Sequence, residues 1–155
     1  MSTDTYLHVQ TKRAGKARGE ATSAGHEGDI LVRSWSWGVT GNSALGSSNA
    51  PGRSYKQLTV DKSVDAASTA LLNALVKNDE VKEAKLTMRK AGEGQVDYFT
   101  LTLKNARIVS VDLVGDESGS MTEQIALSFT TVEIEYRPQQ GTGSSGASHT
   151  FSDDL

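Results

Sequence analysis

The stretch AKLTMRKAGEGQVDYFTLTL, residues 84–103, contains the pattern that decides the fold. Apolar and polar side chains alternate over residues 84–90, and the alternation resumes over residues 96–103. The apolar series is Ala84, Leu86 and Met88, then Phe99, Leu101 and Leu103. A period of two is typical of strands with one face in a core, and the glycines between the two halves favour a tight loop. This stretch therefore predicts an antiparallel hairpin.

The same period continues on both sides of the hairpin and predicts a chain made mostly of strands. Shorter alternating segments cover residues 6–10, 30–37, 55–63 and 107–114. A last long strand, residues 122–136, changes phase within its length. Its apolar positions are Ile125, Leu127 and Phe129, then Val132, Ile134 and Tyr136. A slip of one residue indicates a β-bulge, which lets one strand bend from one sheet into another.

One segment, residues 65–78, follows a helical period instead. Its apolar stripe is formed by Ala67, Ala70, Leu71, Ala74 and Leu75. Ser63 or Asp65 is placed to cap the start, and Lys77 lies in the last turn, where the helix dipole favours a cation. The sequence therefore predicts a mainly β fold, a mostly antiparallel β-barrel or sandwich with one α-helix.

The 155 residues suffice for a single domain, which we place at residues 1–139. Residues 40–54 are rich in Gly, Ser and Asn and have Leu45 as their one large apolar residue. This composition predicts an extended loop within the domain. Residues 140–155 begin with a Gly- and Ser-rich sequence, which predicts a flexible C-terminal tail.

Composition argues against several classes of function. The formal net charge is −3, from 16 Lys and Arg against 19 Asp and Glu, which gives no basic footprint for nucleic acid or an acidic membrane surface. The absence of cysteine excludes disulfides, thiolate nucleophiles and cysteine-ligated zinc. No run of apolar residues exceeds three, so we expect no membrane insertion, and the polar start argues against a secretory signal.

Motifs for chemistry are equally sparse. His8, His26 and His149 stand far apart and lack a second ligand at metal spacing, so we expect no metal site. Ser34 and Ser36 lie outside any G-x-S-x-G elbow, and no phosphate-binding glycine motif opens a helix. We therefore expect neither an enzyme nor a bound cofactor.

Two features are open to both a structural and a functional interpretation. Basic residues at positions 12, 13, 16 and 18 suit phosphate or an acidic partner, but a solvated loop explains them as well. Trp35 and Trp37 share one face of a strand, which is a large apolar area for a chain with so few aromatic residues. These tryptophans belong either to the core or to a surface that meets another subunit.

Several motifs occur in one order along the chain. They are RGE at 18–20, HEGDI at 26–30, WSWG at 35–38, KLTMRKAG at 85–92 with Tyr98, and a last strand that runs from Thr122 to Tyr136, Pro138 and Gln139. This ordered set resembles the haemolysin-coregulated protein (Hcp) family, the tube protein of type VI secretion. The resemblance covers about residues 4–139, and residues 64–83 resemble the family in pattern only.

The resemblance implies a small antiparallel β-barrel of two sheets with one α-helix alongside. This barrel assembles into hexameric rings, which stack into a hollow tube. A contractile sheath drives the tube outward beneath a spike, and small effector proteins are carried in the ring lumen. Ser36, between two tryptophans, is the implied lumen and effector contact. We expect subunit or ring contacts at Trp35, Trp37, Asn42, Leu45 and Arg53. Assembly in the bacterial cytoplasm and secretion without a signal peptide follow from the same resemblance.

Barrel geometry is consistent with this assembly. A barrel of this size is filled by its own side chains, so a pore has to lie between subunits, and closed rings terminate identical heterologous contacts. The alternative is a monomeric ligand-binding β-barrel, which needs an apolar interior pocket. A hydrolase would need a polar triad that these residues do not supply.

Overall fold

The computed structural model describes residues 3–41, 52–90, 96–138 and 147–155. In chain order its elements are β1 (Thr3–Thr11), β2 (Gly15–Lys16), β3 (Ile30–Leu31), β4 (Ser34–Ser36), β5 (Val39–Gly41), β6 (Arg53–Tyr55), β7 (Leu58–Ser63), α1 (Ser68–Val76), β8 (Val81–Lys90), β9 (Asp97–Gly115), β10 (Met121–Ser128), β11 (Thr131–Tyr136) and β12 (His149–Asp154).

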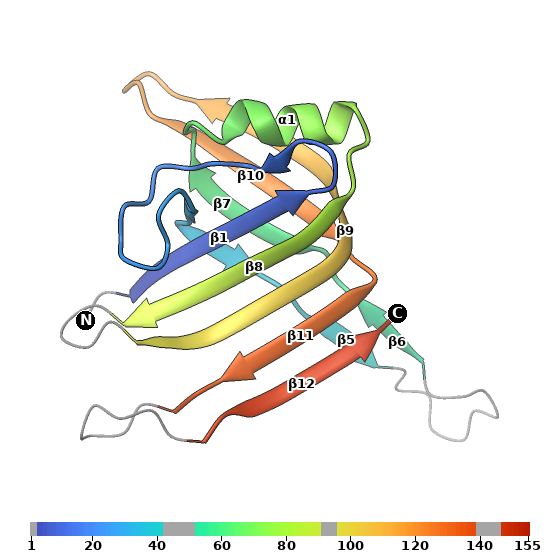
Figure 1. Ribbon diagram of the computed structural model, residues 1–155. Helices are drawn as coiled ribbons and strands as arrows, with labels where there is room; N and C mark the ends of the chain where they lie inside the picture. The colour runs from blue at the N-terminus through green and yellow to red at the C-terminus, as the bar shows by residue number, and fades with distance from the viewer. Residues whose placement is uncertain (1–2, 42–51, 91–95, 139–146) are drawn as a thin grey trace.

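The strands form two layers that face one another (Figure 1). The front layer has the order β2-β1-β8-β9-β11-β12 and the back layer the order β9-β10-β7-β4, with antiparallel neighbours throughout. Strand β9 is long enough to belong to both layers, and β5 and β6 form a separate ribbon. The predicted mainly β barrel of two sheets with a helix alongside is confirmed.

The chain changes layer at two neighbouring places. In β9, Asn105 has φ 49°, a left-handed conformation that asparagine tolerates, and it separates the residues paired with β11 from those paired with β10. Residues 129–130 separate β10 from β11, and the Thr130 hydroxyl donates a hydrogen bond to the Lys104 carbonyl at 3.3 Å. The predicted change of sheet within residues 122–136 is confirmed, although two strands replace one bulged strand.

Residues 30–36 close the barrel between the edges of the two layers. Strand β3 pairs with β1 of the front layer, and β4 pairs with β7 of the back layer. The segment predicted as one strand is therefore two, and the break between them shifts which positions point inward. Ile30 is buried and Leu31 is exposed, whereas Trp35 packs against the core.

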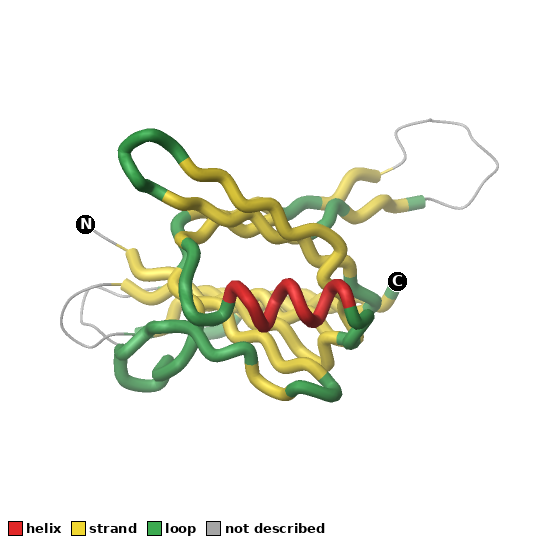
Figure 2. Tube along the Cα trace, turned by 90° about the horizontal axis from the view of Figure 1, so that it is seen from above, coloured by secondary structure: helices red, strands yellow, loops and turns green. Residues whose placement is uncertain are grey.

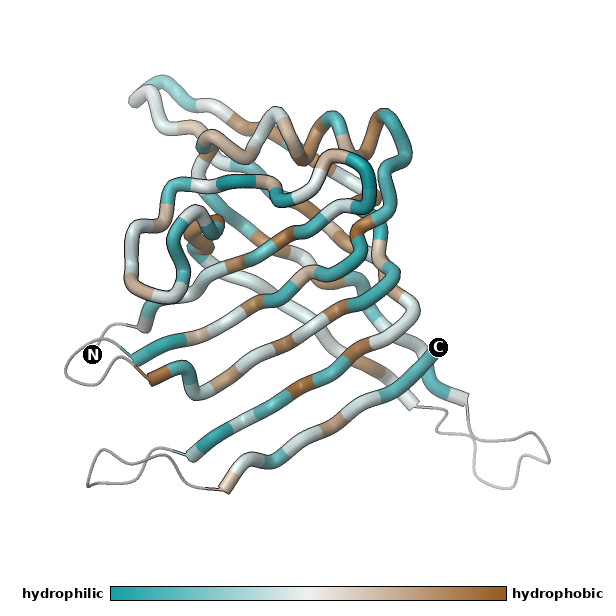
Figure 3. Tube along the Cα trace, in the orientation of Figure 1, coloured by the Kyte–Doolittle hydropathy of each residue, from teal (hydrophilic) through white to brown (hydrophobic). Residues whose placement is uncertain are grey.

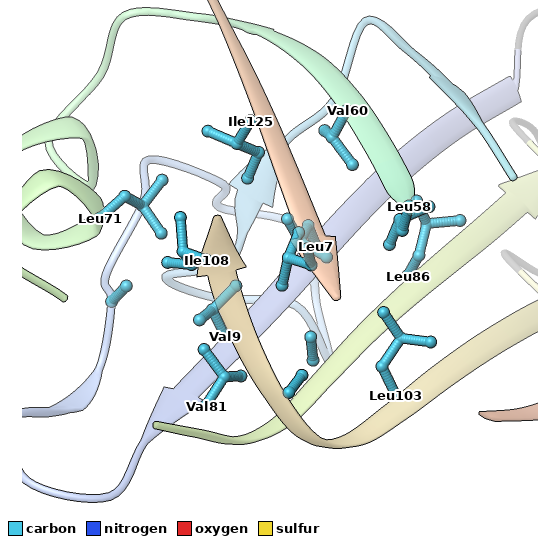
Figure 4. Packing of buried hydrophobic residues seen from close by; sticks show 14 of the residues in the cluster. Leu7, Val9, Leu58, Val60, Leu71, Val81, Leu86, Leu103, Ile108 and Ile125 are labelled. Carbon is cyan, nitrogen blue, oxygen red and sulfur yellow. The ribbon is translucent and has the colours of Figure 1, made fainter. Parts of the chain in front are cut away.

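Apolar side chains from both layers meet between them. Figure 3 shows the expected alternation of hydropathy along the strands of the front layer, and Figure 4 shows inward-pointing side chains packed together. The fully buried members include Leu7, Val9, Ile30, Leu58, Val60, Leu71, Val81, Leu86, Leu101, Leu103, Ile125, Leu127 and Val132. The alternation read from residues 84–103 thus identifies their core face correctly.

Helix α1 covers one end of the space between the layers, as Figure 2 shows from above. It buries Ser68, Leu71 and Ala74 and ends at Val76, and Asn78, just after the C-cap residue Lys77, adopts φ 54°. The helix begins later than predicted because Asp65 stabilises a turn before it. The Asp65 carboxylate accepts a hydrogen bond from the Ala67 amide at 3.0 Å. Ala67 is the N-cap residue of the helix and has no side-chain oxygen that could cap the helix amides.

A buried charge cluster fastens the helix start to the back layer. Lys62 of β7 and Glu123 of β10 are 0% and 1% exposed, and the Lys62 Nζ lies 2.5 Å from Glu123 Oε1 and 2.9 Å from Asp65. The Ser68 hydroxyl of α1 donates a hydrogen bond to the same Glu123 oxygen at 2.6 Å. Each charge is paired, so the cluster is stable only while it is complete.

Two predictions on connections need correction. The tail prediction is wrong for residues 149–154, which form β12 and pair with β11, because backbone hydrogen bonding requires no apolar alternation. The predicted loop 40–54 begins and ends inside the β5–β6 ribbon, where Thr40 pairs with Ser54. The predicted hairpin loop at residues 91–95 lies outside the described residues.

Removing one member of the buried cluster should strongly destabilise the fold. Lys62→Ala leaves the Glu123 and Asp65 carboxylates without their cation, and we expect the free energy of unfolding to fall by about 3–5 kcal/mol. Chemical denaturation followed by circular dichroism measures this change. The matched control is Lys85→Ala on the exposed face of β8, expected to change stability by less than about 0.5 kcal/mol. Equal stabilities of the two variants would show that the cluster contributes nothing.

Candidate interaction surfaces

The motif residues near the N-terminus form a compact anchor rather than an open site. His26 is 8% exposed and lies between two carboxylates, with Nδ1 2.8 Å from Asp29 and Nε2 3.2 Å from Asp97 of β9. Its ring stacks on Tyr6 of β1 with centroids 4.3 Å apart. Arg89 of β8 binds Asp97 at 2.7 Å. These contacts fix the loop that precedes β3 against three strands of the front layer.

Asp29 joins the anchor to β1 and β2 as well. Lys16 of β2 lies 2.9 Å and His8 of β1 3.5 Å from its carboxylate. Burial alone raises the pKa of Asp29, but the hydrogen bonds and charges of Lys16 and His26 outweigh burial, so the pKa lies below the ordinary aspartate value. The carboxylate is therefore ionised at neutral pH and holds β2, β1 and the loop together.

The backbone packs closely enough in this anchor to require glycine. A Cβ atom on Gly19 would lie 2.5 Å from the Asp29 carbonyl oxygen, which is backbone and cannot rotate away. Gly28 has φ 78°, a conformation that glycine adopts without strain. The glycines of the RGE and HEGDI motifs are thus explained by packing.

The back layer presents two different faces. Residues directly opposite one another on neighbouring strands share a face, so the pairing defines rows across β4, β7, β10 and β9. The inward row is Trp35, Val60, Ile125 and Val111. Two outward rows are Ser36, Thr59, Ala126 and Ser110, and Ser34, Asp61, Gln124 and Asp112. These two outward rows are therefore built from small or polar side chains.

Ser36 lies on this outward face and is exposed, as the alternation with its neighbouring tryptophans predicts. Beside it, the Ser34 hydroxyl donates a hydrogen bond to Asp61 at 3.0 Å. Trp35 and Trp37 are half-buried and point to the other side, where Trp35 stacks on Phe99 and Trp37 on Tyr55. The core interpretation accounts for these contacts, and the contact with another subunit stays a prediction.

The other sequence-predicted contact residues lie apart from the tryptophans. Arg53 of β6 binds Asp153 of β12 with Nε–Oδ2 2.5 Å, and Tyr55 donates a hydrogen bond to the same carboxylate. This ion pair ties the C-terminal strand to the β5–β6 ribbon, and the contact of Arg53 with another subunit stays a prediction. Asn42 and Leu45 lie outside the described residues.

Among the described residues, no helix combines the length and apolar character needed to cross a membrane. Within the same ranges, no group of three or more His, Asp or Glu side chains is arranged so that it could hold a metal ion. Each buried charge described above has an oppositely charged partner, and these pairs hold segments of backbone in place.

Comparison with known protein families identifies the family of this chain. The model of the family described as "Type VI secretion system effector, Hcp" matches residues 6–136, which is most of the barrel. The chain belongs to the Hcp family. It is 32% identical over 148 residues to the protein hcp1 of Pseudomonas aeruginosa, a match that covers 92% of this chain and 88% of that protein.

Solved structures agree with this assignment. Hcp1 from Salmonella typhimurium is 28% identical with a TM-score of 0.76, covering 99% of this chain and 95% of that one. A type six secretion system protein reaches a TM-score of 0.86 at 22% identity, covering 99% of this chain and 96% of that one, which shows the fold. This Hcp chain is thus a type VI secretion tube protein with a β-barrel fold, and the resemblance read from the sequence motifs is confirmed.

Two surfaces of this Hcp chain are absent from the sequence predictions. One is the exposed end of the β9–β10 hairpin, and the other is a groove beside α1. The apolar residues Leu113 and Val114 lie past the core, and they are the one signal in the sequence that pointed to the hairpin surface. The groove is lined by residues about 60 positions apart in the sequence, such as Ala14 and Ala74, so no local sequence pattern could have predicted it.

The Asp29 anchor predicts a pH dependence of stability. At neutral pH, Asp29→Asn should lower the free energy of unfolding by about 1.5–3 kcal/mol, because hydrogen bonds to a charged group are lost. The pKa of Asp29 is lower in the folded state than in the unfolded chain, where it is about 3.9. The ionised carboxylate therefore stabilises the fold fully at pH values above the unfolded-state pKa, and this stabilisation is lost as the pH falls through the folded-state pKa. The difference between wild type and variant should shrink over that acidic range.

Denaturation curves recorded at several pH values measure this difference. Glu27→Gln, an exposed carboxylate of the same loop, is the matched control and should change stability by less than about 0.5 kcal/mol at neutral pH. A stability difference between wild type and Asp29→Asn that stays constant down to strongly acidic pH would contradict the assignment.

Proposed function

We propose that this chain forms hexameric rings that stack into a hollow tube, with the outward face of the back layer lining the lumen. In this proposal the lumen carries small effector proteins, and Ser36 contacts them. The tube is built in the bacterial cytoplasm and is secreted by a machine with a contractile sheath and a spike. The subunit contacts expected of Trp35, Trp37, Asn42, Leu45 and Arg53 belong to the same proposal.

The contrast between the two faces of the back layer carries this proposal. Its inward row is apolar and packs on the core, whereas the two outward rows contain hydroxyl, amide, carboxylate and methyl groups and no lysine or arginine. A channel wall that meets water and many different cargoes needs small polar side chains that neither block the channel nor bind anything strongly. These two outward rows have that composition.

The barrel interior supports a lumen between subunits rather than within one. The core side chains of both layers are almost completely buried, and small barrels are filled in this way. A ring of identical subunits closes heterologous contacts and leaves an axial hole. The competing function, a monomeric ligand-binding barrel, would use the barrel interior instead and would need no partner.

The mass in solution distinguishes the two functions. We expect size-exclusion chromatography with light scattering to give about six times the 16.5 kDa of one chain at micromolar concentration. The ring should persist on moderate dilution, because closure makes every contact depend on the others. A species of one chain mass across the same range would instead favour the monomeric ligand-binding barrel.

A longer side chain at position 36 tests the lumen assignment. Ser36→Gln should leave the ring mass and thermal stability unchanged, because the side chain points away from the core, but it should narrow the channel and reduce effector retention. The matched control is Thr69→Gln on the exposed surface of α1, which should retain effectors like the wild type. The readout is co-purification of an effector with the ring and its export. Equal retention by both variants would remove Ser36 from the cargo site.

A further inference from the structure

The β9–β10 hairpin carries uncovered apolar side chains beyond the end of the core. Leu113 pairs with Glu123, which pairs with Lys62, so Leu113 lies in a row whose other two members are buried. Nevertheless Leu113 is 53% exposed, and Met121 beside it is 59% exposed. The inward face of the back layer therefore continues past the helix without anything to cover it. Figure 2 shows this hairpin projecting from the body.

The tip of this hairpin is acidic and held in one conformation. Asp116 and Glu117 are its charged residues, and residues 109–121 contain no lysine or arginine. The Asp116 carboxylate accepts hydrogen bonds from the Ser118 hydroxyl at 2.6 Å and the Ser120 amide at 3.1 Å. These bonds lower the pKa of Asp116, so the tip presents fixed negative charge at neutral pH.

A groove with complementary character lies between α1 and the β1–β2 turn. It has a volume of about 400 Å³, and Ala14, Ala70 and Ala74 contribute apolar wall to it. The groove is preformed because the Asp79 carboxylate accepts hydrogen bonds from the backbone amides of Arg13 and Ala14, both at 3.0 Å, and so holds the turn against the helix end. An apolar side chain of a partner would find space here without rearrangement.

The rim of the groove is basic. Arg13 and Lys77 are exposed on its two sides, and the Arg13 guanidinium also donates a hydrogen bond to the Lys77 carbonyl at 2.8 Å. Arg107 adds a third cation at the same helix end through its hydrogen bonds to Asn78. An apolar groove with a basic rim matches an apolar hairpin with an acidic tip in both respects.

The two surfaces lie at opposite ends of the subunit. In Figure 1 the hairpin projects at the upper left, whereas the C-terminal end of α1 and the β1–β2 turn lie at the right, and Figure 2 agrees. One subunit therefore cannot place its hairpin in its own groove. A contact that joins different surfaces on two copies is heterologous, so every copy can give one hairpin and receive another.

We propose that the β9–β10 hairpin of one copy docks into the groove between α1 and the β1–β2 turn of a second copy. Leu113 and Met121 enter the apolar groove, and the carboxylates of the tip pair with Arg13 and Lys77. This inference rests on the self-assembly proposed above and names the surfaces that make one of its contacts.

Disulfide trapping tests the contact directly, because the chain contains no cysteine of its own. One version of the full chain carries Glu117→Cys at the hairpin tip, and a second, distinguishable by a tag, carries Asn73→Cys at the groove. Mixed under mild oxidation, the two versions should form a mixed disulfide several-fold faster than a pair in which Lys85→Cys replaces Asn73→Cys. Lys85 is exposed on β8 and serves as the matched control.

Light scattering on the same mixture separates the possible failures. Assembled particles without the Glu117–Asn73 disulfide above the Lys85 control would overturn the docking contact and leave the proposed function standing. Chains that neither assemble nor cross-link would overturn both. A cross-linked product between hairpin and groove supports the contact whatever the size of the assembly.

A pair of surface substitutions supplies a second measurement. Leu113→Ser should weaken self-association roughly ten- to hundredfold, since an apolar side chain no longer enters the groove. Leu31→Ser removes an equally exposed leucine, 50% exposed, from another surface and should leave association unchanged. Thermal unfolding of both variants checks that the fold is intact. Equal association constants for the two variants would contradict the docking contact.

Discussion

Strand β9 imposes the constraint on which the remaining structure depends. Its first half pairs with β8 and β11 in the front layer, and its second half pairs with β10 in the back layer. Backbone groups removed from water must stay hydrogen-bonded, so a strand shared by two layers forces its neighbours to change layer at the same level. Strand β9 bends at Asn105, and the neighbouring chain is interrupted at residues 129–130, so the two layers meet at these two places. The apolar core lies between the layers.

Charged side chains stabilise the places where the barrel would otherwise come apart. The Lys62–Glu123 pair holds the start of the helix to the back layer, and His26 between Asp29 and Asp97 holds a long loop to the front layer. Removing charges from water is costly, and that cost is offset only when every charge is paired in good geometry. In this protein, buried charge therefore maintains the shape of a structural subunit.

The surfaces of the subunit differ in polarity and charge, and each suits a different kind of contact. The two outward rows of the back layer are small and polar, which suits the channel wall that we propose for them. The β9–β10 hairpin and the groove beside α1 are both apolar and carry charges of opposite sign at their edges, which suits the contact between copies that we propose. A tube protein needs both kinds of surface, because its contacts must be specific while its channel must bind nothing too strongly.

The strand alternation of residues 84–103, the change of phase before Val132 and the apolar stripe of the helix could all be predicted from the sequence. These are local patterns, since side-chain period follows directly from backbone geometry. The contacts of His26 with Asp97 and of Lys62 with Glu123, and the pairing of β12 with β11, became visible only in the folded chain. Those partners are brought together by the path of the chain, and a polar strand paired through its backbone leaves no apolar period in the sequence to reveal it.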